Sequence, residues 1–140
     1  QLLMFTPEVT TSTKESRTTL PNSYSKDDLV KSVGNVSMLT AMLASNTFND
    51  EVFKIVTQDV IHQPFRLEAC RPSKAAFIEF KKAGAVAQWL SGSGPSVAAL
   101  VKEEDVAQII LQIEKLELDC AFSCKAIAIK QDGVREETSF

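Results

Sequence analysis

Two short apolar runs lie close together in the second half of this chain, and their separation restricts the fold more than any other feature. Residues 85–90 (AVAQWL) and 97–101 (VAALV) have the length and composition of β-strands, and only residues 91–96 (SGSGPS) connect them. Two strands joined by so short a glycine-rich link pair as antiparallel neighbours. The sequence therefore predicts a β-hairpin within a sheet.

The other segments predict helices and strands on both sides of this hairpin. Ser25, followed by Asp27 and Asp28, predicts the capped start of a helix that runs to about Ser45. Apolar residues occur on two faces of this helix, so we expect it to be buried on most sides. Further helices are expected over residues 51–61, 72–83 and 103–116, and further strands over residues 1–5 and 120–129.

The order of these elements predicts the fold class. Strand, helices, strand, strand, helix, strand is the split βαβ pattern of ferredoxin-like domains, here with an enlarged first helical crossover. We expect an α+β sandwich in which helices cover one face of an antiparallel sheet. The 140 residues are enough for one hydrophobic core, so residues 1–140 are expected to form a single domain.

Composition excludes several classes of function. The net charge of −3 argues against nucleic-acid binding, which requires a basic face. No apolar run approaches the ~20 residues that span a bilayer, and we expect no signal peptide. The odd number of cysteines favours reduced thiols in the cytoplasm. Cys120 and Cys124 have no histidine nearby and are expected to face one side of a strand rather than to bind zinc.

The link between the two strands also has the chemistry of an anion site. Gly92 and Gly94 lack the Cβ atoms that would keep a ligand away from the backbone, and their N–H groups can converge on an anion. The hydroxyls of Ser93 and Ser96 can donate to the same anion, and Pro95 stiffens the turn. An ordinary hairpin turn made of small residues explains the same composition equally well.

A longer stretch around this link resembles a known family. Residues 83–100 (AGAVAQWLSGSGPSVAAL) resemble the third conserved motif of the GHMP kinases, which phosphorylate small molecules. The resemblance implies the C-terminal domain of such a kinase. It also implies that the active-site loop, which packs against an ATP-binding loop of the N-terminal domain, consists of Gly92, Ser93, Gly94, Pro95 and Ser96.

Two further stretches resemble the homoserine kinases within that superfamily. They are residues 12–21 (STKESRTTLP) and residues 59–66 (DVIHQPFR), the latter with phenylalanine where tyrosine is commoner. The resemblance implies that Arg17 and Arg66 bind the carboxylate of L-homoserine, and that Thr13 lies near the reacting hydroxyl and phosphate. An arginine fork suits a carboxylate because two parallel N–H donors match its two oxygens. The implied setting is threonine biosynthesis in the cytoplasm.

The parts of a complete GHMP kinase that do not appear are also informative. No P-x-x-x-G-L-G-S-S-A-type phosphate loop occurs in the chain, and no acidic residue has the context of a magnesium ligand. ATP and Mg²⁺ are therefore expected to bind in the complete enzyme, through an N-terminal half outside these residues. For this chain alone we expect no cofactor, no metal site and no turnover.

Other interpretations remain open. The chain could belong to another GHMP kinase that acts on a small alcohol, or to a non-catalytic ferredoxin-like module that binds an amino acid. His62 is the only histidine, but we favour a role at the end of the 51–61 helix over a role as general base. Trp89 is expected in the core. The apolar first strand and the helix that begins near Ser25 suggest an interface with the N-terminal half or a homodimer.

Overall fold

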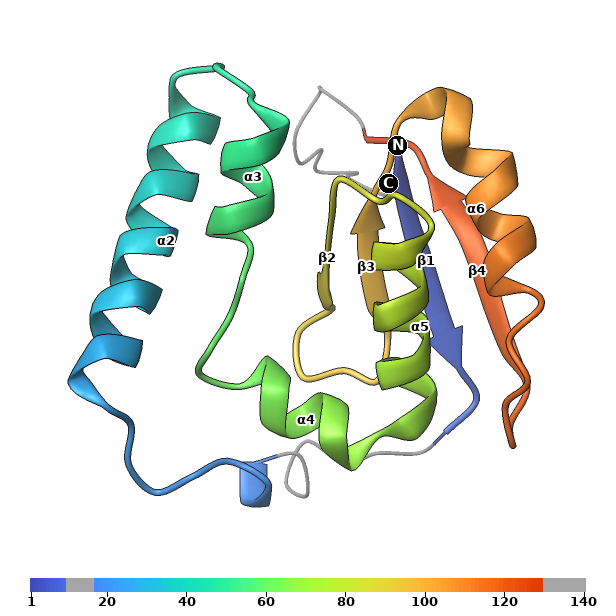
Figure 1. The fold of residues 1–140 in the computed structure, drawn as a ribbon, viewed down its shortest axis with the longest axis horizontal. Coiled ribbons are helices and arrows are strands. Elements are labelled where there is room, and N and C mark those ends of the chain that lie inside the picture. The colour runs from blue at the N-terminus through green and yellow to red at the C-terminus, as the bar shows by residue number, and fades with distance from the viewer. Residues whose placement is uncertain (10–16, 130–140) are drawn as a thin grey trace, which may run out of the picture.

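The computed structural model describes residues 1–9 and 17–129 of the chain. These residues form one layer of sheet and one layer of helices (Figure 1). The elements in chain order are β1 Leu2–Pro7, α2 Lys26–Ala44, α3 Asp50–Val56, α4 Gln63–Ala69, α5 Arg71–Lys82, β2 Ala87–Leu90, β3 Val97–Leu100, η1 Glu103–Asp105, α6 Val106–Ile113 and β4 Phe122–Ile127.

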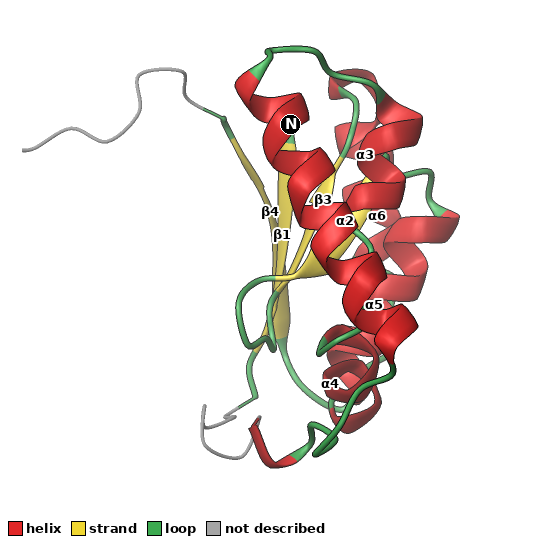
Figure 2. Cartoon of the chain, turned by 90° about the vertical axis from the view of Figure 1, so that its left-hand side faces the viewer, coloured by secondary structure: helices red, strands yellow, loops and turns green. Residues whose placement is uncertain are grey.

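The four strands form one antiparallel sheet in the order β2-β3-β1-β4. The predicted hairpin is present, because Leu90 of β2 pairs with Val97 of β3 and residues 91–96 join them. The helices lie on one side of the sheet (Figure 2). Strand order and layering confirm the predicted ferredoxin-like α+β fold.

The main core lies between the sheet and helices α5 and α6. Alternate residues of the central strands point toward these helices, as the period of two in a strand requires. The residues of this cluster that solvent cannot reach at all are Leu3, Phe5, Ala76, Phe80, Val97, Ala99, Ile109 and Ile113. The sheet end that carries residues 91–96 is thus attached to a rigid, fully buried centre.

A smaller apolar cluster joins α2 and α3 to the edge strand β2. It contains Met42, Phe53, Val56 and Ala87, and Trp89 packs against it only partly buried. Ser25 caps α2 as predicted, because its hydroxyl accepts the Asp28 N–H at 3.0 Å. The N-terminal part of α2 extends past the end of the short α3 (Figure 1).

The prediction that α2 is buried on most sides is wrong. Met42 is its only buried residue, and half or more of the surface of Leu29, Val30, Val33, Val36, Met38 and Leu43 is exposed. The physical reason is length: α2 has 19 residues, whereas its neighbour α3 has seven and covers mainly the C-terminal part. The helical spacing predicts α2 itself correctly, but no described element covers the rest of its apolar surface.

The predicted helix over residues 51–61 is too long. The structure ends α3 at Val56 and begins a separate helix, α4, that the sequence did not predict. His62 therefore precedes the start of α4 and does not lie at the end of a helix. The carboxylate of Asp59 accepts backbone N–H groups at this point, and these bonds replace the ones that a continuing helix would make.

The last two elements are shorter than predicted. Glu103–Asp105 form a 3₁₀ turn, and α6 then ends at Ile113. Strand β4 begins at Phe122, so Cys120 lies outside it and does not share a strand face with Cys124.

All three cysteines are free thiols, and burial raises the pKa of Cys124 to about 11, with a smaller contribution from the charge of Glu114. Within the described ranges, no helix is both long and apolar enough to cross a membrane.

Candidate functional site

The stretch DVIHQPFR forms a turn that starts α4. Asp59 accepts hydrogen bonds from the backbone N–H groups of Ile61 and His62 through one carboxylate oxygen, and from that of Gln63 through the other at 3.4 Å. A carboxylate before a helix satisfies N–H groups that have no intrahelical partner. Pro64 lies in the first turn, where its missing N–H is not required. Local sequence thus fixes where the helix begins and which side chains it presents.

Gln63 attaches this helix to the sheet. Its side chain is 5% exposed, and its amide oxygen accepts the backbone N–H of Leu90 at 2.6 Å. Leu90 is the last residue of β2, and residues 91–96 follow directly. The start of α4 and the start of the glycine-rich bend are therefore held together by a buried hydrogen bond, worth about 1 kcal/mol or more because neither group can reach water.

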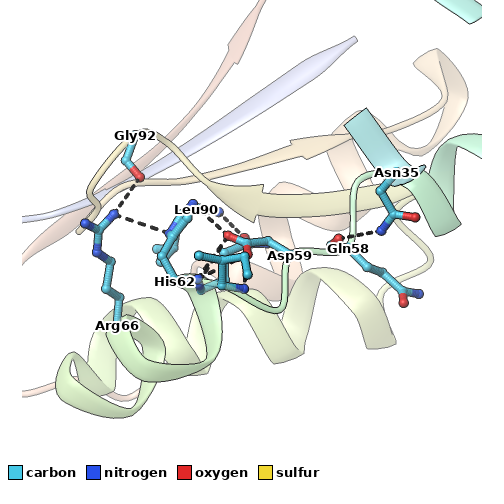
Figure 3. Close-up of polar contacts among 9 residues, drawn as sticks. Asn35, Gln58, Asp59, His62, Arg66, Leu90 and Gly92 are labelled. Atoms are coloured by element: carbon cyan, nitrogen blue, oxygen red, sulfur yellow. Dashed lines mark hydrogen bonds and ion pairs between the residues drawn. The ribbon is translucent and has the colours of Figure 1, made fainter. Parts of the chain in front are cut away.

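Arg66 lies one turn further along α4, against the bend. Its Nη1 atom is 3.5 Å from the carbonyl oxygen of Gly92 and 3.3 Å from Nδ1 of His62 (Figure 3). Arg66 and Gly92 are 26 positions apart in the chain. The structure thus brings together Arg66 and the bend, two of the three places where site residues were predicted.

The bend itself, residues 91–96, is held by several short-range bonds. The Ser91 N–H donates to the Ser96 carbonyl at 2.9 Å, and the Gly94 N–H donates to the Ser91 carbonyl at 3.0 Å. Gly92 and Gly94 have positive φ angles of 59° and 76°, which favour glycine. Pro95 follows a cis peptide bond, and its carbonyl accepts the fully buried Ser73 hydroxyl at 2.5 Å.

Part of the bend remains open for a ligand. Within the described part of the chain, the N–H groups of Gly92 and Ser93 have no hydrogen-bond acceptor. A Cβ atom added at Gly92 would meet nothing within 4 Å, so space exists beside its backbone. Among the described residues, the Ser93 hydroxyl contacts the Gly94 carbonyl and the Ser96 hydroxyl contacts the Thr6 hydroxyl, each at a long 3.4 Å. Neighbouring N–H donors of this kind can bind an anion.

The remaining predicted residues are placed less completely. Thr13 lies outside the described residues. Arg17 is exposed at the start of a short helical turn. This turn lies at the end of the molecule where α4 also lies (Figures 1 and 2). The roles predicted for Thr13 and Arg17 stay predictions.

The electrostatics of the site centre on His62. Burial lowers its pKa below the ordinary value of 6.5; the charge of Asp59 opposes this, and the charge of Arg66 adds to it. Nε2 of His62 is 2.7 Å from a carboxylate oxygen of Asp59. Among the described residues, no three histidine, cysteine or acidic side chains gather in a way that could bind a metal ion.

Sequence reasoning missed three residues that build this site: Asp59, Gln63 and Ser73. All three act through hydrogen bonds to backbone groups of other segments or turns. One signal was available, because an Asp five positions before Pro64 indicates a capped helix start. The partners of Gln63 and Ser73 lie more than 20 positions away and leave no local pattern.

Comparisons with known proteins identify a family and several relatives. A family model described as GHMP kinases C terminal matches residues 29–117. A homoserine kinase of Mycobacterium sp. (strain KMS) is 34% identical over 134 residues, 94% of this chain and 40% of the relative. A homoserine kinase of Clostridium acetobutylicum is 33% identical over 99 residues, 71% of this chain and 33% of that relative.

A solved structure gives the same result. The crystal structure of homoserine kinase from Cytophaga hutchinsonii matches with a TM-score of 0.75 and 25% identity, over 90% of this chain and 41% of that one. This chain therefore spans well under half the length of each of these three proteins. Because the family model matches more than half of it, from Leu29 to Glu117, the chain belongs to the GHMP kinases, as their C-terminal domain.

Proposed function

We propose that residues 1–140 are the substrate-side domain of an ATP-dependent homoserine kinase, which transfers a phosphoryl group to the side-chain hydroxyl of L-homoserine in threonine biosynthesis. The observation that carries this proposal is the contact between the Arg66 guanidinium and the Gly92 carbonyl, in a chain similar to proteins named homoserine kinase. An arginine fork beside a bend with open N–H groups suits a substrate that carries a carboxylate and receives a phosphoryl group.

The proposal gives each predicted residue a role. Arg66 and Arg17 bind the carboxylate of homoserine, and Thr13 lies near the hydroxyl that is phosphorylated. The bend formed by residues 91–96 limits the active centre on the phosphate side. Phosphoryl transfer has a loose transition state, so orientation and charge stabilisation by such groups account for most of the catalysis.

The complete enzyme supplies the rest of the reaction. ATP and Mg²⁺ bind in an N-terminal half that these residues do not contain, which agrees with the missing phosphate loop. That half is the expected intramolecular partner of this domain. Like other reduced, disulfide-free biosynthetic enzymes, the protein is proposed to work in the cytoplasm.

The test is steady-state kinetics of the full-length protein that carries this chain, with ADP production as the readout. We expect Arg66→Gln and Arg17→Ala each to raise KM for homoserine by about ten- to a hundredfold, the equivalent of one lost charge-assisted contact. KM for ATP should change little. Arg71→Gln is the matched control, because the exposed guanidinium of Arg71 pairs with Asp119 rather than with the bend.

Two results would contradict the proposal. A full-length protein that phosphorylates another small alcohol much better than homoserine would assign the domain to a different GHMP kinase. Unchanged KM for homoserine in Arg66→Gln would remove Arg66 from the site. The chain of 140 residues by itself should produce no ADP, and measurable turnover would show that it contains the ATP site.

A further inference from the structure

His62 contacts both charged side chains at the start of α4. Its Nε2 atom is 2.7 Å from a carboxylate oxygen of Asp59, and its Nδ1 atom is 3.3 Å from Nη1 of Arg66 (Figure 3). The ring therefore lies between the carboxylate that starts the helix and the guanidinium at the bend. Neither ring nitrogen is left for a substrate, so this arrangement does not suit a general base.

The two contacts select one form of the imidazole. A carboxylate only accepts hydrogen bonds, so Nε2 must carry a proton. A guanidinium only donates, so Nδ1 must be unprotonated and offer its lone pair. Both requirements hold in the neutral Nε2–H tautomer alone. A proton added at Nδ1 would replace an acceptor with a second donor and bring two positive groups to 3.3 Å.

This contact bears on where the guanidinium of Arg66 points. The same Nη1 atom reaches Nδ1 of His62 and the Gly92 carbonyl, so the imidazole and the bend both contribute to its direction. Asp59 fixes the ring in turn, and the Asp59 carboxylate is held by backbone N–H groups of the helix start. A series of contacts thus links the backbone at the start of α4 to Arg66 through Asp59 and His62.

We propose that His62 is a positioning residue that holds Arg66 toward the bend only while its ring is neutral, so that homoserine binding weakens as the medium becomes acidic. This proposal rests on the proposed function, because it requires that Arg66 bind the substrate carboxylate. Protonation of His62 breaks the acceptor contact and lets the guanidinium turn away from the bend.

The surroundings of the ring agree with a neutral resting state. Burial, the largest effect, lowers the pKa of His62, and Arg66 lowers it further against the opposing effect of Asp59. The ring also borders a cavity of about 660 Å³ whose α2 wall contains no titratable group: Ser32, Asn35, Val36, Leu39 and Leu43. The β2 residues on that cavity, Trp89 and Leu90, carry no charge. Among the described residues, Asp59 and Arg66 are the charged groups that act on His62.

The sign of the pH effect follows from this shift. Because the pKa of His62 is lowered from 6.5, the ring is neutral at and above pH 7 and becomes protonated only below 6.5. Substrate binding should be at its strongest near neutral pH and should weaken as the pH falls. The carboxylate and ammonium groups of homoserine keep their charges in this range, so the change reports on the protein.

The experiment uses the full-length enzyme and measures KM for homoserine between pH 5 and 8 at saturating ATP. For the wild type we expect KM to rise about tenfold toward the acid end, while kcat changes less. His62→Leu, which offers no acceptor, should raise KM about tenfold at every pH. The Gln side chain of His62→Gln offers an NH₂ group as donor and a carbonyl oxygen as acceptor but does not titrate. It should recover most of this loss and should show no acid rise.

The comparison of wild type with His62→Gln also controls for the titration of ATP. The phosphate groups of ATP titrate near pH 6, and they affect both assays equally. Thermal unfolding of each variant checks that it is folded; if His62→Leu is not, the pH profile of His62→Gln decides. Nitrogen NMR of the imidazole gives a second readout, since the Nε2–H tautomer has a distinct pair of ¹⁵N shifts. The signal of His62 is assigned by its loss in the variant.

The outcomes separate the two proposals. If the wild type does not phosphorylate homoserine, the proposed function fails. If it does, and Arg66→Gln raises KM but His62→Gln keeps the acid rise of the wild type, the positioning role fails alone. An imidazole that is charged at pH 7, or in the other tautomer, would also overturn it.

Discussion

At the scale of single residues, the site depends on side chains that bind backbone groups rather than substrate. Asp59 starts α4, Gln63 joins it to β2, and Ser73 holds the Pro95 carbonyl of the bend. Each of these polar atoms is paired, and the described residues contain no buried side-chain nitrogen or oxygen without a partner. These three side chains keep the backbone in place at the start of α4 and at the bend. Arg66 can therefore approach Gly92.

Gln63 gives the sharpest test at this scale. Gln63→Ala leaves the Leu90 N–H buried without an acceptor, and we expect the free energy of unfolding to fall by about 1–3 kcal/mol. Urea unfolding followed by circular dichroism measures this. Gln88→Ala is the matched control, since Gln88 lies on β2 near Leu90, is half-buried, and makes no side-chain hydrogen bond to any described residue. Equal losses in both variants would mean that the Gln63 bond does not stabilise the fold.

At the scale of elements, α2 differs from the other helices. Helices α5 and α6 each bury two or more residues in the main core, whereas α2 buries only Met42. Its N-terminal cap is satisfied by Ser25 and Asp28, so the helix is locally well specified. Its stability in place, however, depends on a small cluster near its C-terminal end.

This difference predicts unequal effects of substitution along α2. Met42→Ala should lower the free energy of unfolding by about 2–4 kcal/mol, because it leaves a cavity beside Phe53. Val33→Ala, at a position that is 67% exposed, should change it by less than about 0.5 kcal/mol. Both substitutions create alanine in the same helix, so helix propensity contributes little to the contrast. Similar losses, measured by chemical unfolding, would show that α2 is covered over its whole length.

At the scale of the whole molecule, the helical layer ends in an apolar surface on α2. Its exposed residues are Leu29, Val30, Val33, Val36, Met38 and Leu43. Leu29, Val33, Val36 and Leu43 recur at helical spacing and share one side of α2, and an exposed apolar side of this kind is typical of an interface in the complete protein. The N-terminal half or a second copy would cover it.

We therefore expect the 140-residue chain, expressed alone, to self-associate through α2. Sedimentation velocity should show a sedimentation coefficient that rises with protein concentration. The double substitution Val33→Lys and Val36→Lys places two charges on this face and should keep the chain monomeric. Lys31→Ala is a surface control on the same helix. A wild-type chain that stays monomeric at every concentration would reject the homodimer.

The sequence by itself determined most elements and their order. Helical spacing, the Ser25 cap and the glycine-rich link between residues 85–90 and 97–101 predicted α2, the hairpin and the ferredoxin-like sandwich correctly. These signals are local, because caps, turns and periodic side chains act within a few positions of the chain. The predicted helix over residues 51–61 was too long for a different reason. The Asp59 carboxylate accepts backbone N–H groups that a longer helix would use, and the apolar spacing does not reveal this.

Only the tertiary structure decided which side chains meet. The contacts of Arg66 with Gly92, of Gln63 with Leu90 and of Ser73 with Pro95 join positions 22 to 27 residues apart. They exist because α5 packs against the sheet and α4 packs against α5, which brings the start of α4 to the end of β2. No local sequence pattern encodes this proximity. The exposure of α2 was decided in the same way, since burial depends on the length and position of a neighbouring helix rather than on the apolar pattern itself.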